Sequence, residues 1–315
     1  MNTKALERFA QAARRQLLDE VGAKLEQALA TDSAELREKA TTVQELRKQI
    51  KANSKEAVID RVAYTWFNRF CALRFMDANH YTRAGVVSPL PGHTQPEILQ
   101  DAKQGHIVED LQQTIDADRV FALLSGELPS SDPQGEAYRL LLVGVCNQYH
   151  KQMPFLFEKI ADYTELLMPD DLLSEASLLH AMREAMTDEV CEDIEVVGWL
   201  YQFYISEKKD QVIGKVVKSE DIPAATQLFT PNWIVKYMVQ NSLGAQWLAT
   251  YPDSKIREQM EYYIEPAEQT DEVNAQLAAI TPSSLDPETM TLIDTRPVAL
   301  GTSLWRPMSS SRPYT

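Results

Sequence analysis

Residues 64–77 read YTWFNRFCALRFMD, and this stretch decides the fold class. Apolar side chains recur around it at intervals of three and four residues: Val58, Val62, Trp66, Phe70 and Leu73. That spacing is typical of an α-helix, so we expect one helix over residues 56–79. The stretch is apolar on more than one face, which indicates a helix at the centre of a bundle.

Two basic residues, Arg69 and Arg74, lie inside this apolar helix. A buried arginine needs polar partners, because an unpaired buried charge is strongly destabilising. The sequence favours a structural core helix in which both side chains find such partners. A contact from these arginines to nucleic acid is the alternative reading.

The flanking sequence extends the helical pattern in both directions. Residues 1–55 carry apolar residues at helical spacing with charges between them. Further helices are expected at 98–127, 135–150, 154–167, 171–188 and 192–208. Residues 80–97 contain two glycines and three prolines and predict a loop.

The composition agrees with a helical chain and narrows the class of protein. Only 11 of the 315 residues are glycine, where average usage would give about 22. The net charge of −15 argues against this chain alone gripping DNA phosphates. Three distant cysteines suit buried thiols in a reduced, cytoplasmic protein. We expect no metal site, because the five histidines are scattered, and no membrane span or secretory signal.

Residues 221–244, DIPAATQLFTPNWIVKYMVQNSLG, hold the most specific local signal. An extended segment at Thr226–Phe229 is expected to lead into a helix with Thr230 as its N-cap and Pro231 at its first position. Gly244 is a plausible C-cap. A helix N-terminus presents free N–H groups that suit a carboxylate or phosphate, although capped helices are common in all proteins.

The sequence changes character after Asp294. Thr291–Asp294, TLID, reads as a short strand that ends in an acid. Residues 295–315, TRPVALGTSLWRPMSSSRPYT, contain no Asp or Glu in a chain that has 46 of them. We expect this tail to be disordered.

Several segments together resemble the adenine-specific DNA methyltransferases of BREX phage-defence systems, the PglX family. The resemblance covers residues 1–294 and is carried by four segments: WFNRFCALRFM at 66–76, GWLYQFY at 198–204, KKDQV at 208–212 and ATQLFTP at 225–231. It implies transfer of a methyl group from S-adenosylmethionine to the exocyclic amine of an adenine in double-stranded DNA. It also implies other BREX proteins as partners, in a system similar to restriction–modification.

The same resemblance implies a set of cofactor-binding residues. Phe229, Thr230 and Pro231 would wall the methionine end of S-adenosylmethionine, and Gln227 would order that turn. Asp294 would accept a hydrogen bond from the cofactor's amino group. No catalytic residue is assigned, because the family's Asn-Pro-Pro-aromatic loop is not found in this sequence.

The family's glycine loop, Asp-Pro-Ala-Cys-Gly-Ser-Gly, should follow the strand but is not present. Reverse translation of residues 295–315 with suitable synonymous codons, read two bases later, gives Pro-Ala-Cys-Gly-Ser-Gly followed by an amphipathic helix. We therefore hypothesise a frameshift directly after Asp294. Without the loop, the backbone cannot approach the cofactor closely, so we expect this chain to be inactive by itself.

The sequence thus predicts a mainly α protein followed by the incomplete start of an α/β Rossmann-like methyltransferase domain. The expected regions are a helical extension at 1–55, a helical domain at 56–220, the start of the methyltransferase domain at 221–294 and the tail at 295–315. Two alternatives stay open. One is a helical protein-interaction module of the defence complex without catalysis, and the other is an unrelated helical scaffold.

Overall fold

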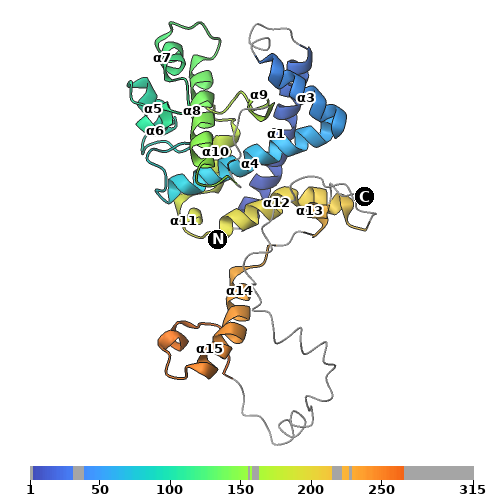
Figure 1. The fold of residues 1–315 in the computed structure, drawn as a ribbon, viewed down its shortest axis with the longest axis vertical. Coiled ribbons are helices and arrows are strands. Elements are labelled where there is room, and N and C mark those ends of the chain that lie inside the picture. Colours follow the sequence, from blue (N-terminus) through green and yellow to red (C-terminus); the bar gives the residue numbers. More distant parts are fainter. Residues whose placement is uncertain are drawn as a thin grey trace, which may run out of the picture. The chain divides into compact units, whose positions relative to one another are not determined.

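The computed structural model describes residues 3–30, 39–154, 157, 163–214, 222–226 and 229–265 (Figure 1). Over these ranges the chain forms helices, turns and one isolated β-bridge between Pro89 and Pro96, with no β-strand. The prediction of a mainly α protein is therefore confirmed. The strand expected at Thr291–Asp294 and the tail at 295–315 lie outside the described residues, so the start of a Rossmann-like domain stays a prediction.

The chain divides into two compact units, Met1–Phe229 and Thr230–Thr315. The helices of the first unit are α1 (Thr3–Ala30), α3 (Ala40–Ala52), α4 (Lys55–Ala78), α5 (Glu97–Lys103), α6 (Glu109–Gln112), α7 (Ala117–Ser125), α8 (Pro133–His150), α9 (Tyr163–Leu166), α10 (Leu178–Ala185), α11 (Asp188–Cys191), α12 (Glu195–Val212) and α13 (Ile222–Thr226). The predicted regions 1–55, 56–220 and 221–294 stay predictions.

Three of the expected helices are shorter than the sequence indicated. Within the range 154–167, the described residues 154 and 157 are not helical, and the helix α9 covers Tyr163–Leu166. The single helix expected at 98–127 is three helices, α5 to α7. Gly105 and Gly126 have φ of 83° and 81°, the left-handed conformation that ends α5 and α7 and that glycine adopts without strain. The helix expected at 171–188 is helical only in α10 and at Asp188, the first residue of α11. Helix α10 begins after Ser177, whose side chain accepts a hydrogen bond from the His180 N–H.

Helix α4 occupies the centre of the first unit, as its apolar pattern predicts. It begins after Ser54, whose hydroxyl accepts a hydrogen bond from the Ala57 N–H at 3.1 Å. Its Trp66 and Phe67 are buried, and Phe67 stacks on Tyr204 of α12 with ring centroids 4.3 Å apart. Helix α1 packs against α4, α10 and α12, so Leu6 and Phe9 near its start are part of this core (Figure 1).

The described part of the second unit is a short series of helical segments. They are α14 (Asn232–Val239), the π-helical segment η2 (Gln240–Gly244), α15 (Ala245–Thr250) and the 3₁₀ segment η3 (Lys255–Gln259). The prediction that Gly244 is a C-cap is wrong, because the backbone stays helical through it at φ −63°. A Cβ at Gly244 would lie 2.8 Å from the methyl carbon of Met260, so this glycine permits a close side-chain approach.

Candidate functional site

The structure describes three of the five predicted cofactor residues. Gln227 and Asp294 lie outside the described residues. Phe229 is the last residue of the first unit, and Thr230 and Pro231 begin the second. The cofactor-binding role of all five residues therefore stays a prediction.

The start of α14 differs by one residue from the prediction. Pro231 is the N-cap, with φ −53° and ψ 141°, and Asn232 is the first helical residue. The Pro231 carbonyl accepts hydrogen bonds from the N–H groups of Ile234 and Val235 at 3.0 and 3.3 Å, so proline supplies the first acceptor of the helix. The predicted N-cap Thr230 lies one position earlier and is exposed.

The extended segment expected at Thr226–Phe229 is also different at its first residue. Thr226 is the last residue of α13, and its hydroxyl donates to the Ile222 carbonyl at 2.8 Å. A threonine side chain in the last turn of a helix often bonds the carbonyl four residues earlier, which competes with the extended conformation.

Phe229 lies against α12 of the first unit. Its backbone N–H donates to the Gln202 Oε1 at 3.0 Å. Its ring meets the Trp199 ring edge-on, with centroids 5.3 Å apart and planes at 65°. A Cβ on Gly198 would lie 2.1 Å from the Phe229 Cε2, so only glycine leaves room for the ring at that position. Sequence reasoning did not find this contact, because no spacing rule links residues 198–202 to residue 229.

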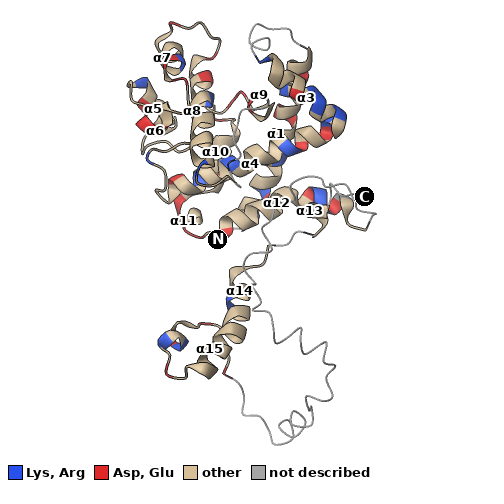
Figure 2. Ribbon diagram, viewed as in Figure 1, with Lys and Arg blue, Asp and Glu red and all other residues tan. Residues whose placement is uncertain are grey.

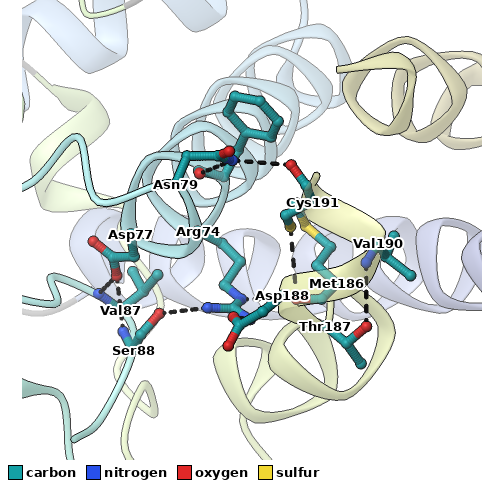
Figure 3. Close-up of polar contacts among 11 residues, drawn as sticks. Arg74, Asp77, Asn79, Val87, Ser88, Met186, Thr187, Asp188, Val190 and Cys191 are labelled. Atoms are coloured by element: carbon teal, nitrogen blue, oxygen red, sulfur yellow. Dashed lines mark hydrogen bonds and ion pairs between the residues drawn. The ribbon is translucent and has the colours of Figure 1, made fainter. Parts of the chain in front are cut away.

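The two arginines of α4 are buried, and their burial favours the structural reading over a nucleic-acid contact. Arg74 donates to the Met186 carbonyl at 2.8 Å, the Ser88 hydroxyl at 2.9 Å and the Asp188 carboxylate at 2.7 Å (Figure 3). The Arg69 guanidinium lies over the Trp66 ring, 5.2 Å from its centroid. Arg74 therefore joins α4 to the loop at Ser88 and to α11, whereas the contact of Arg69 with Trp66 lies within α4.

Asp77 organises the loop that follows α4. Its carboxylate accepts hydrogen bonds from the N–H groups of Val87 and Ser88, each at 2.9 Å (Figure 3). It also accepts from the Val86 N–H at 3.0 Å and from the Thr82 hydroxyl at 2.8 Å. Burial raises the pKa of Asp77, and these hydrogen bonds to the charged form oppose the rise. All four donors are satisfied by the protein itself, so this carboxylate is structural.

The cysteines and the other ligand-type residues suggest no reactive centre in the described part of the chain. Cys71, Cys146 and Cys191 are free and buried, as the sequence predicts. Burial raises the pKa of the Cys146 thiol to about 12, and a protonated buried thiol is inert. No group of three metal-ligating side chains occurs among the described residues. None of the helices within those ranges combines the length and apolar character that a bilayer crossing requires.

Charges of both signs are interspersed over the described helices (Figure 2). Basic residues gather where α3 leads into α4, but two of them are paired with acids, Lys48 with Glu45 and Lys55 with Glu26. A surface hollow of the first unit is lined by four cations, of which three are paired in the same way: Lys24 with Asp170, Lys39 with Glu165 and Arg139 with Asp170. A phosphate would have to compete with these carboxylates at either place.

The comparisons with known proteins identify relatives of this chain. No protein-family model matches it. The chain is 52% identical over 252 residues to the adenine-specific methyltransferase BrxX of Escherichia coli O9:H4 (strain HS), a match that covers 79% of this chain and 20% of BrxX. It is 34% identical over 297 residues to the adenine-specific methyltransferase PglX of Lacticaseibacillus casei (strain Zhang), covering 80% of this chain and 24% of PglX.

The matches take in most of this chain but only a fifth to a quarter of each relative's length. Identity of 52% over 252 residues is far above what unrelated helical proteins share, so the alternative of an unrelated helical scaffold is wrong. The chain is homologous to the N-terminal portion of the BrxX/PglX adenine-specific methyltransferases.

Proposed function

We propose that this chain supplies the helical region and the first methyltransferase segment of a site-specific DNA adenine-N6 methyltransferase of a BREX phage-defence system. The observation that carries the proposal is the 52% identity to BrxX over 252 residues. The parent enzyme would transfer the methyl group of S-adenosylmethionine to the exocyclic amine of adenine in double-stranded DNA. An enzyme of this kind must flip the target base out of the stack to reach that amine.

Within the parent enzyme, we assign Gln227, Phe229, Thr230, Pro231 and Asp294 to the cofactor pocket. The support is the resemblance of QLFTP at 227–231 to the segment that closes over S-adenosylmethionine in the family. The exposed Thr230 beside the α14 N-terminus is compatible with a polar ligand. The protein would act in the cytoplasm, where DNA and cofactor are available.

This chain by itself is proposed to be inactive, because the sequence after Asp294 lacks the glycine loop. Isothermal titration with S-adenosylmethionine tests this, with full-length Escherichia coli BrxX as the reference. We expect no measurable heat of binding to this chain, and micromolar affinity would overturn the proposal. Sequencing the coding DNA through the Asp294 codon tests the frameshift, which is rejected if the second reading frame does not encode the loop.

A second function, as an interaction module for other BREX proteins, is favoured by one observation. The first unit has a large apolar core, and two of its buried charged side chains, Arg74 and Asp77, bond to the protein itself. Such a unit can fold and present a surface without any catalytic loop. Co-purification of the chain with the BREX proteins expressed from the same operon tests this, and recovery of the chain without any of them rejects it.

A further inference from the structure

We infer that Gly198, Trp199 and Gln202 of α12 form a seat for Phe229, and that this seat is a positioning device for the Thr230–Pro231 turn. The seat itself stands on the contacts within the first unit. Its value for cofactor binding rests on the proposed function, in which that turn walls the pocket.

Three contacts of different kinds meet at Phe229. The Gln202 side chain accepts a hydrogen bond from the backbone N–H of Phe229 at 3.0 Å. The Trp199 and Phe229 rings meet edge-on, and Gly198 leaves space for the Phe229 ring. The N–H contact fixes the main chain, whereas the two ring contacts fix the side chain. A residue held in both ways has little freedom to change position.

The seat is built on a rigid part of the molecule. Val196, Leu200 and Tyr204 of the same helix are at most 1% exposed and belong to the core. Residues three and four apart share one face of a helix, so the seat residues 198, 199 and 202 form a neighbouring stripe. Trp199 is in turn stacked on Phe203, with centroids 5.6 Å apart and planes at 21°.

Gly198 is the most informative residue of the seat. Glycine inside a helix is unfavourable relative to alanine, so its presence needs a physical reason. Here the reason is steric, because the added methyl group of alanine would overlap the Phe229 ring at 2.1 Å. Gly22 in α1 offers a matched control: a Cβ there meets nothing closer than the Ile59 Cδ1 at 3.7 Å.

The position of Phe229 in the chain gives the seat its proposed role. Phe229 directly precedes Thr230 and Pro231, and Pro231 starts α14. By holding Phe229, α12 fixes the point from which the chain enters that turn. Gly198, Trp199 and Gln202 are therefore positioning residues that act through Phe229, and we assign them no contact with a cofactor.

Fluorine NMR of the full chain labelled with 5-fluorotryptophan tests the seat, with the Trp199 signal assigned through Trp199→Phe. Gly198→Ala and Phe229→Ala should both shift the Trp199 signal, whereas Gly22→Ala should leave it in place. Hydrogen exchange gives the second measurement. Gly198→Ala and Gln202→Leu should speed exchange in the peptide containing the Phe229 amide at least about tenfold. Gln202→Glu, which keeps an acceptor oxygen, should restore slow exchange.

An unchanged Trp199 signal and unchanged exchange in Gly198→Ala would overturn the seat. The same holds if Gln202→Leu and Gln202→Glu exchange at the same rate, because the acceptor oxygen would then have no role. The fluorine NMR and hydrogen-exchange measurements need no cofactor. They therefore test the seat even if the proposed methyltransferase function fails. Conversely, a confirmed seat in a chain whose parent enzyme binds no S-adenosylmethionine would reject only the proposed function.

Discussion

Helices α4 and α14 have similar apolar sequence patterns but very different surroundings. In α4 the aromatic residues Trp66, Phe67 and Phe70 are at most 1% exposed. In α14 none of the residues is buried, and Trp233 and Met238 are 55% and 60% exposed. Because most helix stability in proteins comes from tertiary packing, a pattern of apolar residues specifies a core only where other elements supply the opposite face.

The difference continues beyond α14 in the described part of the second unit. Ten of its large hydrophobic side chains are at least two-fifths exposed: Trp233, Val235, Tyr237, Met238, Val239, Leu243, Trp247, Tyr251, Ile256 and Ile264. Ile234, Leu248, Met260, Tyr262 and Tyr263 are half-buried, and only Gly244 is buried among the described residues of this unit. Polar contacts connect its segments instead, such as the Asn241 amide to the Tyr262 carbonyl at 2.7 Å. The first unit is thus stabilised by apolar burial, and the described part of the second by local hydrogen bonds.

The largest expected effect is the difference between two tryptophan truncations. Trp66→Ala should lower the free energy of unfolding by about 3–5 kcal/mol. The residue is fully buried, stacks on Phe70, and donates from its indole N–H to the Thr164 carbonyl at 2.9 Å. Trp233→Ala should change the main unfolding transition by less than about 0.5 kcal/mol. Urea unfolding followed by circular dichroism measures both.

Trp66→Phe separates the contribution of ring burial from that of the indole N–H hydrogen bond, because it keeps an aromatic ring and removes the N–H donor. It should cost less than Trp66→Ala. An equal loss from Trp66→Ala and Trp233→Ala would break the comparison, since α14 would then contribute as much to the core as α4 does.

A somewhat smaller effect is expected at Asp77, whose buried carboxylate accepts four hydrogen bonds from the loop that follows α4. Asp77→Ala removes the acceptor of three backbone N–H groups and one hydroxyl, which are left without their partner in a largely buried loop. We expect a loss of about 3 kcal/mol in unfolding free energy. Chemical denaturation of the variant provides the measurement.

Asp118 of α7 offers the matched control, because it is an exposed acid in the first turn of a helix. The free energy of unfolding of Asp118→Ala should stay within about 0.5 kcal/mol of that of the wild type. Asp77→Asn keeps one acceptor oxygen. Its free energy of unfolding should therefore lie between those of Asp77→Ala and Asp118→Ala. A loss at Asp77 no greater than that at Asp118 would mean that the loop does not depend on this carboxylate.

The sequence was sufficient to predict helices whose position is marked by local features, such as helical spacing of apolar residues or a glycine- and proline-rich loop. The period of α4 and the glycine- and proline-rich loop after it are local features, and each was found in the structure. The resemblance to the methyltransferase family was also readable from short segments, because their combination is specific.

Other features depended on contacts that no local pattern contains. Gly244 looked like a C-cap, but its backbone is helical and its lack of a side chain leaves room for Met260, and Gly198 is explained only by a ring at residue 229. The start of α14 moved by one residue because the Pro231 carbonyl begins the helical hydrogen bonding. The predicted cofactor site could not be assembled in full, because Gln227 and Asp294 lie outside the described residues.

The smallest effect is expected at Asp60, which joins three helices of the first unit. Its carboxylate accepts from Arg14 of α1 at 2.6 Å and from Lys208 of α12 at 2.9 Å. Burial raises the pKa of Asp60, but the hydrogen bond from Lys208 and the charge of Arg14 outweigh this and lower the pKa on balance. Asp60→Asn should reduce the free energy of unfolding by about 1–2 kcal/mol at neutral pH.

The lowered pKa fixes the pH dependence of this loss. A carboxylate whose pKa is lower in the folded state stabilises the fold fully at any pH above its pKa in the unfolded state, which is about 4. This contribution is lost as the pH falls through the pKa of the folded state. Wild type and Asp60→Asn should therefore converge below about pH 4, in denaturation curves measured from pH 7 to pH 2. Glu207→Gln is the control, because Glu207 pairs with Arg15 across the same two helices, α1 and α12, at 3.7 Å and in an exposed position. If the difference in free energy of unfolding between wild type and Asp60→Asn stays constant with pH, the loss comes from packing. Only a titrating carboxylate would make that difference disappear at low pH.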